Sequence, residues 1–160
     1  MHQLTHARSR PGVLRHQVTG RAGSDLLARP SLRTGLQGFL AFAVQRQSFG
    51  LVEARLALRE ELMLGPGDYL HAGTVVAFAD SCAGWGCWKS LPDGRRGFTT
   101  SELKVNLVGT TRMPDVLLCV ARMLHGGSST QVWDATVTRE SDGREIGHFR
   151  CTQQLLAAQR

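Results

Sequence analysis

The sequence predicts an α+β fold in which an antiparallel β-sheet wraps around one long helix. The helix is predicted by residues 71–88, an apolar stretch rich in small side chains and long enough for about five turns. The sheet is predicted by alternating or apolar segments that follow the helix and end at turn residues. Because the turns are mostly short, we expect consecutive strands to pair antiparallel and the helix to cover the face that they bury.

The elements can be placed in chain order. Residues 37–49 have the spacing of a short helix, with Phe39, Phe42, Ala43 and Arg46 on one side. Strands are expected at residues 51–59, 97–108, 116–124, 129–139 and 145–156. Turns or loops are expected at residues 65–68, 92–94, 109–114, 125–128 and 141–143.

The net charge of +6 is concentrated at the N-terminus. Residues 1–36 carry six arginines against one acidic residue, whereas residues 37–160 carry thirteen Lys and Arg against twelve Asp and Glu. The second part is therefore nearly neutral, which argues against a nucleic-acid partner. We expect one domain at residues 37–160, preceded by a basic tail at 1–36 that is disordered because it has no apolar period. A transit peptide and a start-site error are the alternatives for this tail.

Neither a membrane nor an oxidising compartment is indicated. No uninterrupted apolar run approaches the roughly eighteen residues that span a bilayer, and there is no hydrophobic secretory leader. The cysteines, Cys82, Cys87, Cys119 and Cys151, form no CxxC pair and lack the spacing of zinc ligands. We therefore expect reduced thiols in a cytoplasmic protein without a metal site or a membrane partner.

One charged residue, Asp80, interrupts the apolar helix. Its helical neighbours cannot pair with a carboxylate, since they are Val76, Ala77, Ala83 and Gly84. Burial without a charged partner would raise the pKa of Asp80. Such a carboxylate is a candidate nucleophile or general base. The alternative is a structural Asp that hydrogen-bonds a neighbouring element.

Three motifs around Asp80 resemble those of the PaaI-like acyl-CoA thioesterases of the hotdog-fold superfamily, a group related to phenylacetic acid degradation. The motifs are Leu70-His71-Ala72-Gly73, Phe78-Ala79-Asp80 and Thr100-Ser101-Glu102-Leu103-Lys104-Val105-Asn106. The resemblance extends over roughly residues 50–156. It implies a hotdog fold and a hydrolase that converts an acyl-CoA to a carboxylic acid and free CoA, with no cofactor and no metal.

The resemblance also implies roles for individual residues. Asp80 would attack the thioester carbonyl or activate water, and the Ala72 and Gly73 amides at the helix N-terminus would hold the developing oxyanion. Ala72 stands where the family usually has glycine. His71 would act as a base or orient the loop through hydrogen bonds. Thr100 matches a position that can hold the attacking water.

Further expectations concern substrate binding and assembly. Trp85 would line the acyl pocket unless it packs in the core, and Lys104 and Arg112 would meet CoA phosphates unless they are only solvated surface. The open edges of a single sheet invite pairing with a second chain. The resemblance implies a homodimer or homotetramer in which the histidine loop of one chain faces Asp80 and Thr100 of its partner.

One position departs from the family pattern. Many relatives carry Asn or Gln about six residues before the histidine, whereas this chain has Gly65. Without that side-chain amide, a non-catalytic acyl-CoA-binding module is an alternative to hydrolysis. A hotdog dehydratase is a further alternative, although the spacing of His71 and Asp80 is that of the thioesterases.

Overall fold

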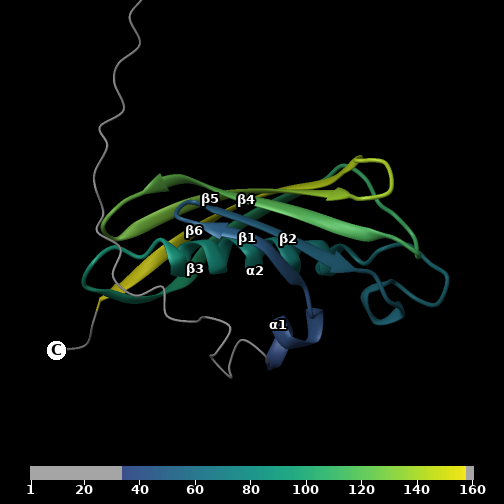
Figure 1. Cartoon of the computed structure of the whole chain (residues 1–160), viewed down its shortest axis with the longest axis horizontal. Helices are drawn as coiled ribbons and strands as arrows, with labels where there is room; N and C mark the ends of the chain where they lie inside the picture. Colours follow the sequence, from purple (N-terminus) through teal and green to yellow (C-terminus); the bar gives the residue numbers. More distant parts are fainter. Residues whose placement is uncertain (1–33, 158–160) are drawn as a thin grey trace, which may run out of the picture.

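The computed structural model describes residues 34–157, and within them the sheet and helix are arranged as the sequence predicts. The elements are α1 (Gly35–Leu40), β1 (Ala43–Ser48), β2 (Leu51–Ala57), the 3-10 turn η3 (Glu60–Leu62), α2 (Ala72–Lys89), β3 (Arg95–Leu107), β4 (Val116–Gly126), β5 (Thr130–Arg139) and β6 (Glu145–Ala157). The six strands form one antiparallel sheet that covers one side of α2 (Figure 1). The predicted α+β class and hotdog fold are confirmed.

The strand order is β1-β2-β4-β5-β6-β3, so β3 lies at one edge of the sheet. Consecutive strands joined by short turns pair as predicted, whereas β3, which a loop separates from β4, does not pair with β4. It pairs with β6, while β4 pairs with β2 and β5. The reason is that residues 108–115 form a connection rather than a tight turn and carry the chain from the edge of the sheet past β6 and β5 to β4. This crossover leaves β3 as an edge strand of 13 residues.

The predicted helix at residues 37–49 is wrong beyond Leu40. Ala41 adopts a left-handed conformation with φ 54°, which ends α1, and the chain continues as β1. Strand pairing decides this segment, because β1 adds to the edge of β2. The ring of Phe42 then packs against Phe78 of α2, with 5.5 Å between ring centroids.

The predicted turn at residues 125–128 begins too early. β4 continues to Gly126, because His125 pairs with Val132 and Gly126 pairs with Gln131 across a bulge in β4. The chain reverses only after Gly126, and Gly127 donates its amide hydrogen to the carbonyl of Thr130. His125-Gly126-Gly127 therefore lies in the β-hairpin that joins β4 to β5.

The core lies between α2 and the sheet, and two helix glycines let the layers approach closely. A Cβ atom at Gly86 would lie 2.4 Å from the ring of Trp133, which is fully buried. A Cβ atom at Gly84 would lie 3.2 Å from the ring of Phe98. Small residues in α2 thus make room for large side chains from β5 and β3.

Along residues 34–157, no helix is long and apolar enough to cross a membrane. The four cysteines are free and buried, and burial raises the pKa of Cys87 and Cys151 to about 12. The tail predicted at residues 1–36 lies almost wholly outside the described residues and stays a prediction. Within the described part, α1 already begins at Gly35.

Candidate active site

Asp80 lies on the face of α2 that is turned toward β3. Residues four positions apart share a helix face, and Gly84 and Trp88 on this face both contact Phe98 of β3. One helical turn before Gly84, the Asp80 carboxylate contacts Thr100, which is the next inward-facing residue of β3 after Phe98. The side chain of Asp80 is half-buried there.

The environment of Asp80 favours its protonated form. Burial raises the pKa of this carboxyl above its usual value, and a hydrogen bond from Thr100 opposes the shift only in part. The Thr100 Oγ1 and Asp80 Oδ1 atoms are 3.3 Å apart. A carboxylate of raised pKa is a better proton acceptor than an exposed one. Asp80 also makes the structural hydrogen bond that was the alternative to a chemical role.

A bulge in β3 lies directly after Thr100. Thr100 pairs with Gln153 of β6, but the register shifts before the next pair, Glu102 with Thr152. A bulge re-aims the side chains that follow it. Thr100 faces α2 because it alternates with the inward-facing Phe98, and the bulge then places Glu102 on the outer face, where Thr152 donates a hydrogen bond to its carboxylate.

His71 is the N-cap of α2. Its backbone is extended, with φ −70° and ψ 131°, and its ring folds back so that Nδ1 accepts the Gly73 N–H at 2.9 Å. A side chain at Gly73 would prevent this, because its Cβ atom would lie 2.9 Å from Nδ1. In a neutral ring of this kind Nε2 carries the proton. The geometry is that of a loop-orienting histidine.

The cap leaves one amide of the helix start available. Gly73 donates to His71 Nδ1 and Thr74 donates to the His71 carbonyl at 3.0 Å. The Ala72 amide, on an exposed residue, has no acceptor among residues 34–157. Free N–H groups at a helix N-terminus attract negative charge. Of the two amides proposed from sequence, Ala72 is the one that can donate to a ligand.

The two halves of the expected site are separated along the helix. An α-helix rises 1.5 Å per residue, so the eight residues from Ala72 to Asp80 correspond to about 12 Å. One thioester carbonyl cannot lie within bonding distance of both groups. Within one chain the structure brings Asp80 and Thr100 together, and it keeps His71, Ala72 and Gly73 apart from them.

The residues expected to bind substrate lie in three different places. Trp85 is buried at 7% exposure, and its indole N–H donates to Gln37 Oε1 at 3.0 Å, so its position is that of a core residue. Lys104 is exposed, and its position in β3 lies opposite that of Arg150 in β6. The side chains of β3 alternate, so Lys104 lies on the outer face, away from Asp80. Neither residue adjoins the Asp80 carboxylate.

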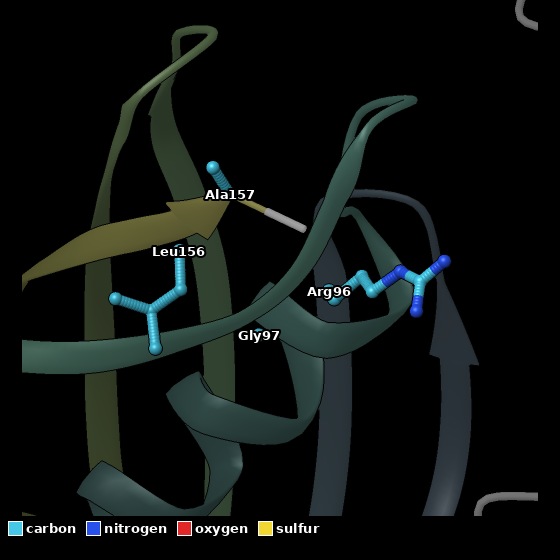
Figure 2. A pocket seen from close by; sticks show the side chains of 4 residues that line it. All are labelled: Arg96, Gly97, Leu156 and Ala157. Carbon is cyan, nitrogen blue, oxygen red and sulfur yellow. The ribbon is translucent and has the colours of Figure 1, made fainter. Parts of the chain in front are cut away.

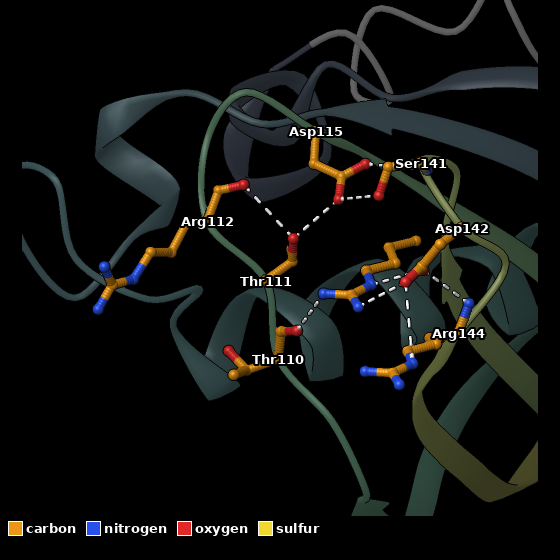
Figure 3. Close-up of polar contacts among 8 residues, drawn as sticks. Thr110, Thr111, Arg112, Asp115, Ser141, Asp142 and Arg144 are labelled. Atoms are coloured by element: carbon orange, nitrogen blue, oxygen red, sulfur yellow. Dashed lines mark hydrogen bonds and ion pairs between the residues drawn. The ribbon is translucent and has the colours of Figure 1, made fainter.

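Arg112 is the third, and it lies near the start of α2. Its guanidinium is stacked over the ring of Tyr69 at 4.0 Å. The neighbouring Thr111 carbonyl accepts the Leu70 amide at 2.9 Å, which fixes this loop beside the residue before His71. Figure 3 shows the Arg112 side chain pointing away from the polar contacts of the loop.

Those polar contacts hold the loop between β3 and β4 in place. Asp115 accepts hydrogen bonds from the hydroxyls of Thr111 at 2.8 Å and Ser141 at 2.9 Å (Figure 3). Burial would raise the pKa of Asp115, but these hydrogen bonds, that from Thr111 foremost, outweigh it and hold the pKa below its usual value. Arg139 adds a two-point ion pair to Asp142. The polar groups of this cluster find their hydrogen-bond partners within it, which suits a structural role.

A pocket elsewhere on the surface contains none of these residues. It is lined by Arg96, Gly97, Leu156 and Ala157, where the start of β3 meets the end of β6 (Figure 2). Across residues 34–157, no three His, Cys, Asp or Glu side chains group together as metal ligands would.

Sequence reasoning missed Gln153. Thr100 Oγ1 lies 3.1 Å from Gln153 Oε1, so Gln153 shares the hydroxyl that contacts Asp80. The available signal was its position in β6, where the inward-facing residues Phe149, Cys151 and Leu155 surround one glutamine. A polar residue at a buried strand position indicates a specific partner.

Comparison with known proteins identifies the family. A family model described as the thioesterase superfamily matches residues 67–146, half of the chain, and includes His71, Asp80 and Thr100. This chain belongs to the thioesterase superfamily. Membership places it among the thioester hydrolases.

One curated relative and two solved structures show what this chain is similar to. The 1,4-dihydroxy-2-naphthoyl-CoA hydrolase of Listeria monocytogenes serotype 1/2a (strain 10403S) is 28% identical over 118 residues, covering 74% of this chain and 93% of the relative. The E. coli PaaI protein from the phenylacetic acid degradation operon shares the fold, with a TM-score of 0.68 and 16% identity over 76% of this chain and 83% of that one. So does smu.793 of Streptococcus mutans UA159, solved with acetyl-CoA, with a TM-score of 0.67 and 20% identity over 76% and 94%.

Proposed function

We propose that this protein hydrolyses an acyl-CoA thioester to a carboxylic acid and free CoA, with Asp80 as the general base. The observation that carries the proposal is the half-buried Asp80 carboxylate of raised pKa, held by Thr100. The named CoA substrate of the Listeria relative and the acetyl-CoA bound to the Streptococcus mutans protein support CoA as the carrier. The Listeria substrate also makes aromatic acyl groups the first to test.

The steps follow from the positions of the groups. Asp80 accepts a proton from water as the water oxygen attacks the thioester carbonyl carbon. The carbonyl oxygen, on which negative charge develops, accepts a hydrogen bond from the Ala72 N–H at the helix N-terminus. The tetrahedral intermediate then breaks the C–S bond, and the proton held by Asp80 passes to the leaving CoA thiolate.

Two chains would supply these groups. The separation of about 12 Å between Ala72 and Asp80 in one helix requires the amide and the carboxylate to come from different subunits. Within residues 34–157, β3 has a sheet neighbour on one side alone and can pair with the β3 strand of a second copy. Leu103 and Leu107 of β3 are large apolar side chains with 44% and 45% exposure, as expected at an interface. We therefore propose a homodimer with shared sites, and dimers can pair further into tetramers.

The activity is tested by following thiol release. The purified protein is incubated with acetyl-CoA, palmitoyl-CoA, benzoyl-CoA and 1,4-dihydroxy-2-naphthoyl-CoA, with Asp80→Asn as the control. We expect hydrolysis of at least one substrate by the parent and a loss of at least about a hundredfold in Asp80→Asn. Tight acyl-CoA binding without thiol release would instead support the binding module that the missing side chain at Gly65 favours. Incorporation of ¹⁸O from water into Asp80 in a single turnover would identify a nucleophile instead of a base.

The shared site is tested with Ala72→Pro. Proline is accepted at the first position of a helix, and the extended backbone of His71 suits a residue before proline. The change therefore removes the Ala72 N–H with little effect on the helix, and Ala72→Ser is the control that keeps it. Loss of one oxyanion donor should lower kcat by about a hundredfold or more.

Complementation then shows whether the sites are shared. Ala72→Pro and Asp80→Ala proteins are dissociated, mixed and reassembled. Half of the resulting dimers are mixed and each has one intact site of two, so about a quarter of the parental activity should return. Proven subunit exchange without any recovery would contradict a shared site.

Arg112 is the better placed of the two cations expected to bind CoA phosphates. It lies against Tyr69, two residues before His71, whereas Lys104 lies on the outer face of β3. We expect Arg112→Gln to raise KM for an acyl-CoA and to leave KM unchanged for the matching N-acetylcysteamine thioester, which has no phosphates. Lys104→Gln is the matched control and should change neither value.

A further inference from the structure

Gln153 occupies an unusual position for a polar side chain. It is fully buried in β6, directly opposite Thr100 of β3 on one side and Gln131 of β5 on the other. Burying an amide is costly unless its atoms are hydrogen-bonded. Within residues 34–157 every buried side-chain nitrogen and oxygen has a partner, so the Gln153 amide is satisfied by its neighbours.

The partners of Gln153 connect it to Asp80. Its Oε1 accepts from the Thr100 hydroxyl at 3.1 Å, and its Nε2 donates to Cys151 Sγ at 3.3 Å. The same Thr100 hydroxyl lies 3.3 Å from Asp80 Oδ1. A hydroxyl group has a single hydrogen, so Thr100 cannot donate fully to both acceptors at once.

We propose that Gln153 is a positioning residue that competes with Asp80 for the Thr100 hydrogen and thereby keeps Asp80 basic. When Asp80 is ionised, one of the two acceptor oxygens lacks the Thr100 hydrogen, and an unsatisfied buried oxygen is costly. When Asp80 is protonated, its O–H donates to Thr100 Oγ1 while Thr100 donates to Gln153, and all three groups are satisfied. Gln153 thus favours proton uptake by Asp80, and its effect on the reaction rests on the proposed role of Asp80 as the base.

The other titratable groups around Asp80 do not interfere with this competition. Cys151 faces it from β6, and burial raises the pKa of that thiol to about 12, so it stays neutral while a carboxyl titrates. Glu102 of β3 accepts a hydrogen bond from Thr152 on the outer face, and Asp134 of β5 is paired with Arg150 there. A change in the titration of Asp80 on altering Gln153 therefore reports on Thr100.

The test is a direct titration of Asp80 in the full chain. Protein labelled with ¹³C at the Asp carboxyl carbons is followed by NMR across pH, and the Asp80 signal is assigned by its loss in Asp80→Asn. In Gln153→Met the Thr100 hydrogen is free for Asp80, so the midpoint should fall by roughly half to one pH unit. The acid limb of kcat/KM should move down with it for the best acyl-CoA of the substrate panel.

Two further proteins separate this effect from a general disturbance of the core. Gln131→Met is the matched control, because Gln131 is equally buried but bonds to Ser90 and Trp133 rather than to Thr100. It should leave the Asp80 midpoint unchanged. In a Thr100→Val background, Gln153→Met should also have no effect, since the shared hydroxyl is gone.

The outcomes separate the two proposals. An Asp80 midpoint that rises or does not move in Gln153→Met would overturn the role of Gln153, whatever the activity shows. If Gln153→Met does not fold, Thr100→Val alone decides. Its midpoint should not rise, because valine removes both the hydrogen that ionised Asp80 shares with Gln153 and the oxygen that accepts the O–H of protonated Asp80. A rise of half a unit or more would overturn the proposal. Full activity of Asp80→Asn would refute the catalytic assignment of Asp80 while leaving the NMR result in place.

Discussion

Replacing Gly86 by alanine should destabilise the protein, although alanine is the better helix former. The added Cβ atom would lie 2.4 Å and 2.5 Å from Cζ3 and Cη2 of Trp133. Carbon atoms in contact prefer roughly 3.5–4.0 Å, so the overlap exceeds about 1 Å. The ring has no room to move, because Trp133 is fully buried and its N–H donates to Gln131 at 2.9 Å.

The cost can be estimated from these contacts. Overfilling a packed core costs about 1–3 kcal/mol. For a domain of this size that loss lowers Tm by roughly 3–15 °C. Gly84→Ala is the matched control, because it gains the same helix propensity of about 1 kcal/mol. Its Cβ atom would meet Phe98 at 3.2 Å, and that ring is only half-buried and can move slightly.

Thermal unfolding followed by circular dichroism measures both variants. We expect Gly84→Ala to melt close to the parent and Gly86→Ala to melt well below it. A Gly86→Ala protein that melts at or above the Gly84→Ala protein would refute the reasoning that α2 touches the sheet at Gly86.

Other predictions concern the site and the chain ends. Asp80→Asn should melt at a higher temperature than the parent at pH 7, because burial raises the pKa of Asp80 in the folded protein and its ionisation therefore costs stability as pH rises. The difference in melting temperature should vanish below about pH 4, where the carboxyl is protonated in both the folded and the unfolded protein. Equal melting temperatures throughout would argue against the raised pKa. Gly73→Ala should displace the His71 ring and cost about 0.5–2 kcal/mol for the lost cap, measured by urea unfolding. It should cost nothing further when combined with His71→Ala. Removing residues 1–33 should leave Tm and thiol release unchanged, because this segment is rich in arginine and has no apolar period; a large fall in Tm would contradict this.

The sequence by itself determined the central helix, most of the strands and the chemistry on them. Small residues and a single carboxylate between residues 71 and 88 predict a helix that lies against a sheet, and Asp80 stands out because none of its helical neighbours can pair with it. The start of the helix beside His71 is also predicted locally, because a helix N-terminus depends on residues within one turn. These features depend on contacts close in the chain, which periodicity and spacing record.

Only the tertiary structure decided which distant segments meet. Pairing β3 with β6, rather than with β4, brings Thr100 opposite Gln153, 53 positions later. Strand pairing likewise turned residues 43–48 from an expected helix into β1. The structure also placed Trp85 in the core and Lys104 on the outer face, because burial and sheet face depend on what packs against a residue. The hydrogen-bond competition at Asp80 exists only because the fold brings α2, β3 and β6 to one hydroxyl group.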